Sequence, residues 1–204
     1  MPYSFCIKPS IDEITQLRKE SFVNFYCEKV RPQGLEWNST DEQSIHIGIR
    51  HQDQLISCLR ITALNDLSEL RDRIKIPLTL NQPPPYILLA RAATSPLFLN
   101  KGLHSLLRIR ALEISLQQNY TQIFGSLEKR STRLNQLLDI GYEIIGEASH
   151  WPNSFLENQG SVVAIQLSSK NKIEKALGKL YTIYQIKPMI HTIETFKFYE
   201  PTHL

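Results

Sequence analysis

The segment Tyr86–Leu107, YILLARAATSPLFLNKGLHSLL, restricts the fold of this chain more than any other. It consists of an apolar run, a turn that contains Lys101 and Gly102, and the start of a helical pattern. This is the pattern of a buried strand that passes through a short loop into a helix. The first backbone N–H groups of such a helix have no partner within the helix, and its dipole favours an anion beside them. We therefore expect a site for a phosphate or pyrophosphate group at this loop.

Size and composition favour one compact domain. With 204 residues, of which 42% are hydrophobic, the chain can bury one sizeable core. The net charge of +3 is too small to indicate nucleic-acid binding, and no nucleic-acid partner is expected. No signal pattern and no apolar stretch of membrane-spanning length is present, so we expect a soluble, cytoplasmic protein.

The three cysteines, Cys6, Cys27 and Cys58, are far apart in the sequence. They form no C-x-x-C pair, so neither a disulfide framework nor a zinc site is predicted, and no metal is expected. Free cysteines are commonly buried, and we expect each of these to be a small core residue.

Apolar periodicity predicts strands and helices in mixed order, which indicates an α/β fold with a mixed central sheet flanked by helices. Ser10 and Glu13 form a capping-box pattern at the first helix, and Asn65 is expected to cap a short helix. The polar tetrapeptide 51–54 predicts a hairpin. The predicted strands are 3–8, 45–50, 55–62, 87–94, 122–127, 142–148 and 161–167. The first predicted helix runs from its cap at Ser10 to about residue 28, and the others are 65–74, 103–118, 131–139 and 172–184.

This order of elements, with the loop at its middle, resembles the GNAT acyltransferase superfamily over residues 3–168. In that family the pyrophosphate of coenzyme A binds to a loop of pattern Gln/Arg-x-x-Gly-x-Gly/Ala, directly after the central strand. Here Gly102 fits, whereas Leu99 replaces the basic or amide residue and His104 replaces the last small one. Where acetyltransferases of the family often carry a tyrosine general acid, this chain has Leu137. The resemblance implies a GNAT-like domain over 1–168 and a C-terminal helical extension and tail over 169–204.

The N-terminal half resembles a narrower branch, the autoinducer (acyl-homoserine-lactone) synthases and the related N-acyl amino acid synthases. Autoinducer synthases carry a glutamate three residues before the arginine of the central strand, and here Leu88 stands three residues before Arg91. This difference argues against a homoserine-lactone product and leaves either an N-acyl amino acid synthase-like enzyme or an unassigned N-acyltransferase. The residues that carry the resemblance are Leu17, Arg18, Phe25, Trp37, Asp41, Ser44, Ile45, His46, Cys58, Leu59 and Arg60.

The resemblance implies a thioester donor, either an acyl-CoA or the acyl-phosphopantetheine of acyl carrier protein. The backbone of Ala92, Ala93 and Thr94 would bind the pantetheine arm and the carbonyl oxygen. The alternative is an ordinary strand–loop–helix connection in which Lys101 is merely solvated. The residues that would hold the phosphate are Asn100, Lys101, Gly102, Leu103, His104 and Ser105.

Three arginines, Arg18, Arg60 and Arg91, are candidates for binding an anionic substrate, because a guanidinium group matches the geometry of a carboxylate or phosphate. The alternative is that they pair with acidic residues at the sheet edge. The acidic residues available for that pairing are Asp41, Glu20 and Glu42.

A general base is less well defined than the donor site. Glu128 follows the fifth strand and His150 lies in a later loop; His46 and His104 are alternatives, and a water relay would need no side-chain base. Phe25 and Trp37 would line an acyl pocket, or else belong to the core.

We therefore expect an N-acyltransferase that moves an acyl group, with a long chain favoured, from a thioester to a primary amine such as that of an amino acid. One alternative is an N-acetyltransferase that uses acetyl-CoA on a small amine or protein. The other is a catalytically silent GNAT fold that serves as a binding module. The expected partners are the amine, acyl carrier protein and a second copy in a homodimer, with residues after Ser168 either at the dimer contact or over the acyl channel.

Overall fold

A seven-stranded mixed sheet forms the centre of the protein, with strand order β1-β2-β3-β4-β5-β7-β6. The computed structural model describes residues 3–26, 35–78, 80, 83–149 and 161–185. Of the pairs between described strands, β4–β5 is parallel and the others are antiparallel. The strands are β1 (Ser4–Ile7), β2 (Ile45–His51), β3 (Gln54–Leu64), β4 (Tyr86–Thr94), β5 (Ile123–Glu128), β6 (Glu143–Ala148) and β7 (Val162–Leu167).

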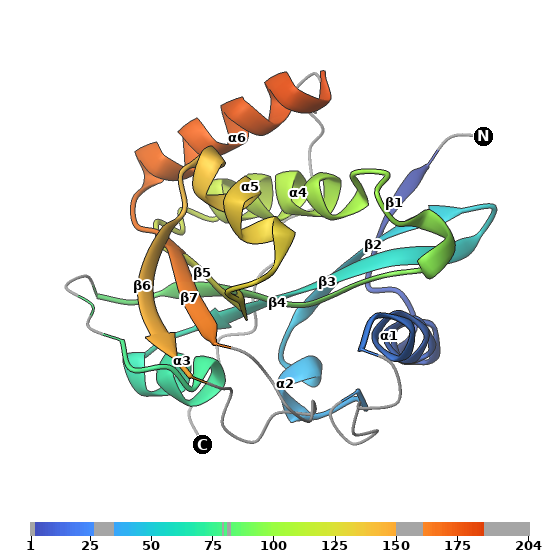
Figure 1. Cartoon of the computed structure of the whole chain (residues 1–204), viewed down its shortest axis with the longest axis horizontal. Coiled ribbons are helices and arrows are strands. Elements are labelled where there is room, and N and C mark those ends of the chain that lie inside the picture. Colours follow the sequence, from blue (N-terminus) through green and yellow to red (C-terminus); the bar gives the residue numbers. More distant parts are fainter. Residues whose placement is uncertain (1–2, 27–34, 79, 81–82, 150–160, 186–204) are drawn as a thin grey trace.

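Helices cover both faces of the sheet (Figure 1). Three helices, α4, α5 and α6, pack on one face, and α1, α2 and α3 lie on the other. The fold class predicted from the periodicity is confirmed. The helices are α1 (Ile11–Tyr26), α2 (Ser39–Glu42), α3 (Leu67–Ile74), α4 (Leu103–Gln117), α5 (Thr132–Ile140) and α6 (Lys170–Tyr184), with a 3₁₀ turn, η3 (Pro96–Phe98).

Local signals explain most of the element boundaries. The Glu13 carboxylate accepts a hydrogen bond from the Ser10 N–H at 2.9 Å, which confirms the capping box. The two residues between β2 and β3, Gln52 and Asp53, have φ of 50° and 65°, as a tight hairpin turn of primed type requires.

Two details differ from the prediction. Asp66, and not Asn65, caps α3, because its carboxylate accepts the Glu69 N–H at 2.8 Å. Asn65 instead donates its backbone N–H to the Glu69 side chain. Helix α2, which the periodicity did not predict, has only four residues and is too short to show a 3.6-residue pattern.

β4 and β5 diverge after a short paired stretch. Their parallel register covers Ile87–Leu88 on β4 and Ile123–Phe124 on β5. Farther along, β4 bulges against β3, so that both Arg91 and Ala92 lie opposite a single residue, and Arg91 has a φ of 50°. The sheet is therefore open between the second halves of these strands, next to the segment that leads to α4.

Helix α6, which the sequence places in the 169–204 extension, packs into the main core. Its residues Ile173, Ala176, Leu177 and Leu180 are buried in the same apolar cluster as residues of α4 and α5. None of the described helices is long and apolar enough to cross a membrane.

Two of the three cysteines can be placed. Cys58 is fully buried, as expected, and burial raises the pKa of its thiol to about 11. Cys6 is half-buried, and Cys27 lies outside the described residues.

Candidate functional site

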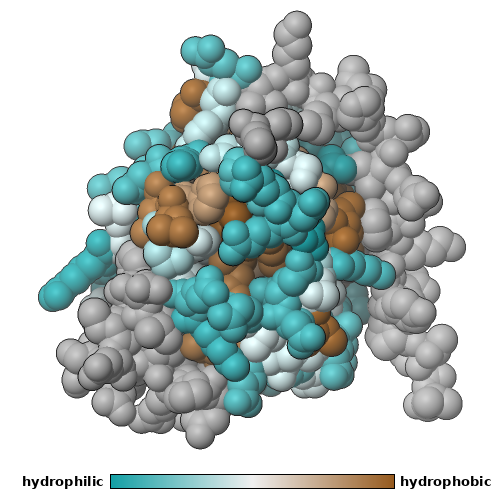
Figure 2. All heavy atoms as spheres, turned by 90° about the vertical axis from the view of Figure 1, so that its right-hand side faces the viewer, coloured by the Kyte–Doolittle hydropathy of each residue, from teal (hydrophilic) through white to brown (hydrophobic). Residues whose placement is uncertain are grey.

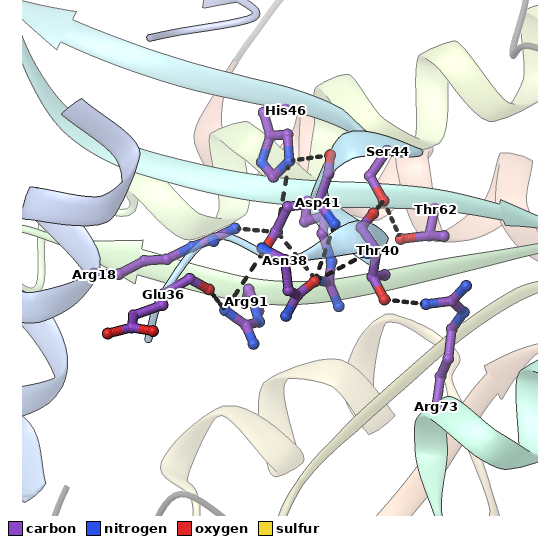
Figure 3. Close-up of polar contacts among 11 residues, drawn as sticks. Arg18, Glu36, Asn38, Thr40, Asp41, Ser44, His46, Thr62, Arg73 and Arg91 are labelled. Carbon is purple, nitrogen blue, oxygen red and sulfur yellow. Dashed lines mark hydrogen bonds and ion pairs between the residues drawn. The ribbon is translucent and has the colours of Figure 1, made fainter. Parts of the chain in front are cut away.

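The Asp41 carboxylate on α2 lies close to arginines from three other elements (Figure 3). Its Oδ1 accepts hydrogen bonds from Arg18 of α1 at 2.9 Å and from Arg60 of β3 at 3.1 Å. Arg91 of β4 places its Nη1 3.7 Å from Oδ2. The alternative in which the arginines pair with an acidic residue is thus confirmed for Asp41. The expected place at the sheet edge is wrong, because β3 and β4 are interior strands.

The short helix α2 holds Asp41 in this position. The Asn38 side chain accepts the Asp41 N–H at 3.2 Å, and Asp41 Oδ2 accepts the Asn38 N–H at 3.2 Å, which forms a reciprocal capping box. One carboxylate oxygen therefore fixes the backbone while the other binds Arg18 and Arg60. Burial opposes ionisation of Asp41, but the hydrogen bond and charge of Arg18 and the charges of the other arginines outweigh it, and its pKa is lowered.

The cluster carries more positive than negative charge. Arg18 is 1% exposed and Arg60 is 7% exposed, and Asp41 is the carboxylate that both contact. Both Nε atoms, and Arg18 Nη1, are buried without a hydrogen-bond partner in the described part of the chain. Burial lowers the pKa of Arg60 to about 10. Because positive charge is in excess and Arg91, which is partly exposed, also belongs to the cluster, the cluster is suited to accept a further anion.

His46 and Trp37 form one side of the cluster. His46 Nε2 lies 3.2 Å from the Asp41 carbonyl oxygen, and its ring lies 4.8 Å from that of Trp37 between centroids. Burial, followed by the charge of Arg18, lowers the pKa of His46 to about 4. His46 is therefore neutral near pH 7 and buried, which fits a structural role.

The aromatic residues predicted to line an acyl pocket can be placed only in part. Trp37 is partly buried and packs against the apolar cluster formed by α1, β3 and β4. The side chain of Phe25 lies outside the described residues. Phe22, one turn earlier on α1, packs on the same cluster as Trp37 and was not singled out from the sequence.

A cavity of about 380 Å³ adjoins the arginines on the face of the sheet that carries α2 and α3. Arg60 and Arg91 reach it from β3 and β4, whereas Glu69 and Asp72 reach it from α3. Arg73 closes one side through a hydrogen bond to the Thr40 hydroxyl. With charges of both signs on its walls, the cavity suits a small zwitterion. Its lining residues are Asn38, Thr40, Arg60, Glu69, Asp72, Arg73 and Arg91.

The start of α4, on the other face of the sheet, differs from the starts of the other helices. Side chains cap α2, α3, α5 and α6, but no described side chain caps α4. Asn100 and Gly102 have φ of 60° and 73°, which turns the chain sharply into the helix. The backbone N–H groups of the first turn are therefore not consumed by a cap, as an anion site requires.

Positive charge surrounds this helix start. His104 Nε2 is buried without a hydrogen-bond partner among the described residues. Burial, followed by the charges of Arg133 and Arg108, lowers the pKa of His104 to about 3. Lys101 places its ammonium group 5.0 Å from the centre of the Phe98 ring.

The loop before α4 exposes apolar side chains. Leu97 is 83% exposed and Leu99 is 44% exposed. Figure 2, which faces this end of the molecule, shows hydrophobic residues at the surface among hydrophilic ones. Leu99 therefore brings no polar group to the loop at the position where the family has a basic or amide residue.

The other predicted site residues are placed as follows. On β4, the Ala93 carbonyl accepts the Ser57 hydroxyl at 3.0 Å, and the Thr94 N–H donates to Ser21 Oγ at 3.2 Å. Ala92 lies at the bulge. Glu128, the last residue of β5, is half-buried, and His150 lies outside the described residues. Their roles stay predictions.

Sequence comparison identifies no relative, because no protein-family model matches and a search of curated proteins finds none. Solved structures do match in fold. An N-acetyltransferase from Staphylococcus aureus Mu50 has a TM-score of 0.59 at 9% identity, over 82% of this chain and 99% of that one. A Bacillus subtilis acetyltransferase in complex with CoA has a TM-score of 0.52 at 12% identity, over 82% and 99%. An acetyltransferase of the GNAT family from Streptococcus pneumoniae has 0.52 at 13%, over 80% and 98%. The expectation of a GNAT fold is confirmed, and this chain has that fold.

Proposed function

We propose that the protein is an N-acyltransferase that moves an acyl group from a phosphopantetheine thioester, such as an acyl-CoA, to the primary amine of a carboxylate-bearing acceptor. The observation that carries this proposal is the arrangement around β4. On one face of the sheet, β4 leads to the uncapped start of α4. On the other, Arg91 of the same strand lines the charged cavity. A donor site and an acceptor site thus adjoin one open region of the sheet.

The residues at the start of α4 fit a phosphate group. The backbone N–H groups of Leu103 and His104 belong to the first turn, where the helix dipole stabilises a negative charge. Lys101 and Arg108 add positive charge nearby. A phosphate site formed largely by backbone N–H groups tolerates Leu99 and His104 in place of the residues of the GNAT loop pattern. The reason is that backbone donors depend little on side-chain identity.

The cavity residues would bind the acceptor. Arg91 and Arg60 would hold its carboxylate, while Asp41 keeps their guanidinium groups in place. Because Arg60 and Arg91 both line the cavity, a carboxylate bound there would meet two guanidinium groups. This favours an amino acid over an uncharged amine as acceptor, and agrees with the N-acyl amino acid synthase-like expectation.

The reaction requires little from the protein beyond positioning the amine against the thioester. The amine nitrogen attacks the thioester carbonyl carbon, the C–N bond forms, the C–S bond breaks, and the proton lost by the amine ends on the thiolate. We assign the β4 backbone at Ala92 to stabilise the charge that develops on the carbonyl oxygen. Glu128 or a water molecule would carry the proton.

A thermal-shift panel tests the proposal, with CoA, acetyl-CoA, a long-chain acyl-CoA and acylated carrier protein as ligands. A ligand at a hundred times its Kd adds about 2.7 kcal/mol to the free energy of unfolding. Greater stabilisation by the long-chain donors would support the acyl-synthase reading, and equal stabilisation by acetyl-CoA would favour the acetyltransferase. Binding without turnover of any amino acid would indicate a silent module. No shift with any ligand would overturn the proposal.

A further inference from the structure

The C-terminal helix α6 lies along α4 and ends at the start of that helix (Figure 1). Tyr181 fixes how the two helices meet, since its hydroxyl donates to Glu113 Oε1 of α4 at 2.6 Å. Arg110 holds the other oxygen of Glu113 at 2.9 Å. This partly buried contact places the next residue on the same side of α6, Tyr184, over the first turn of α4.

Tyr184 makes two contacts with the loop that we assign to the donor phosphate. Its hydroxyl donates to Ser105 Oγ at 2.8 Å. Its ring packs on Gly102, where an added Cβ would lie 2.6 Å from Tyr184 Cε1. A residue remote in sequence thus contacts both the glycine of the loop and a side chain of the first helical turn.

These contacts leave the backbone donors of α4 available. Tyr184 bonds to a side chain, and no described side chain caps the helix. A serine hydroxyl that accepts a hydrogen bond keeps its own proton to donate, and the bond from Tyr184 polarises it toward a stronger donor. Tyr184 therefore leaves the Ser105 hydroxyl able to donate to an anion, and it does not itself occupy the position of that anion.

Two positions of the loop, Leu99 and His104, offer no charged or available polar group to an anion. Leu99 is an exposed leucine, and His104 is held neutral near pH 7 with its Nε2 buried and unpartnered in the described structure. We propose that Tyr184 is a positioning residue of the donor site, which orients the Ser105 hydroxyl toward the phosphate of the pantetheine arm. On this view α6 supplies from the C-terminal side a polar contact that Leu99 and His104 do not provide. The inference rests on the proposed function.

The test compares Tyr184→Phe with the matched control Thr182→Val, which loses a hydroxyl from the same helix that donates to the Gly178 carbonyl, away from the loop. Isothermal titration measures the Kd of three ligands, namely pantetheine, 4′-phosphopantetheine and CoA. We expect Tyr184→Phe to weaken the two phosphate-bearing ligands by about 3- to 10-fold, the range for one net hydrogen bond. Pantetheine binding should not change, and Thr182→Val should leave all three affinities within about 2-fold of wild type.

A second variant distinguishes the loss of the hydrogen bond between Tyr184 and Ser105 from a general effect on packing. Ser105→Ala should carry at least the penalty of Tyr184→Phe, and the double variant should lose no more than Ser105→Ala alone, because Tyr184 acts only through Ser105. A penalty that also falls on pantetheine, an additive double variant, unchanged affinities, or tighter binding of CoA would each overturn the role of Tyr184. Wild-type protein that binds none of the three ligands would instead overturn the proposed function, and this inference with it.

Discussion

Positive charge is concentrated on both sides of β4, but by different structural means. On the cavity side, Asp41 brings together Arg18, Arg60 and Arg91 through buried side-chain contacts. On the side of α4, the positive potential comes from the helix start, which no described side chain caps, and from cations near it. The first arrangement depends on the identity of each side chain, and the second depends mostly on backbone. The cavity side should therefore be the more sensitive to single substitutions.

Asp41→Asn is the change that tests this contrast most strongly. It keeps the shape of the side chain but leaves guanidinium groups buried without their counter-ion, which typically costs about 3–5 kcal/mol. We expect the free energy of unfolding, measured in urea, to fall by that amount. Glu143→Gln serves as control, because it breaks an ion pair with Lys172 whose partners are about half exposed and should have little effect. Equal effects of the two variants would show that the Asp41 cluster is not a stability centre.

Arg91→Gln should separate the two sites by function. Arg91 lines the cavity and is partly exposed, so its loss should affect acceptor binding more than folding. We expect kcat/KM for an amino acid acceptor to fall about 10- to 100-fold, which corresponds to about 1.4–2.7 kcal/mol.

The Kd for CoA should stay at the wild-type value in Arg91→Gln. Arg50→Gln removes a guanidinium that pairs with Glu13, outside the cavity lining, and should leave both parameters unchanged. A matching loss of CoA affinity in Arg91→Gln would mean that the cavity belongs to the donor.

Gly102 and Gly178, both on the α4 side of the sheet, allow a matched comparison of two glycine-to-alanine substitutions. Gly102 has a φ of 73° and no room for a Cβ against Tyr184, so Gly102→Ala should destabilise the protein by about 1 kcal/mol or more and weaken CoA binding. Gly178 lies within α6 with no atom within 4 Å of an added Cβ. Gly178→Ala should stabilise the protein by about 0.5–1 kcal/mol. Thermal melts with and without CoA check both, and a neutral Gly102→Ala would contradict the close contact.

The pH dependence of stability tests one histidine in each region. Burial lowers the pKa of His46 to about 4 and that of His104 to about 3, whereas both titrate near 6.5 in the unfolded chain. Between about pH 6.5 and 4 the unfolded state therefore binds more protons, and the free energy of unfolding must fall as the pH falls. Above about pH 7 the two histidines contribute no slope.

Urea midpoints at pH 7.5, 6 and 5 measure this slope. The carboxylate of Glu13, whose pKa is lowered to about 2 by the hydrogen bond from Arg50, destabilises only below about pH 4.5 and does not interfere. Replacing either histidine with asparagine should reduce the change of the urea midpoint with pH. A midpoint that is constant over this range would show that neither ring is held neutral.

Much of the fold followed from local patterns in the chain. The boundaries of β4 and α4 agree with the prediction to within a residue, because a long apolar period, a glycine and a proline turn mark them. The cap of α3 was placed one residue too early, since Asn65 and Asp66 are both good cap residues and only the geometry of the turn selects between them.

The site was predictable in its residues but not in its arrangement. The three arginines were singled out from the sequence, yet their common partner was one of three carboxylates considered, and only packing chose Asp41. Phe22 carried no signal that distinguished it from other apolar positions on α1. The hydrogen bond between Tyr184 and Ser105 joins residues 79 positions apart, which no local pattern can reveal.

The sequence by itself determined the alternation of strands and helices and the strand–loop–helix segment at the centre, because these depend on periodicity, capping and backbone preference within a few residues. Tertiary structure alone decided the separation of β4 from β5, the pairing of three arginines with one carboxylate, and the position of α6 over α4. Each of these joins segments that are distant in the chain. Their energies come from burial and charge compensation, which exist only after the sheet and both helical layers have assembled.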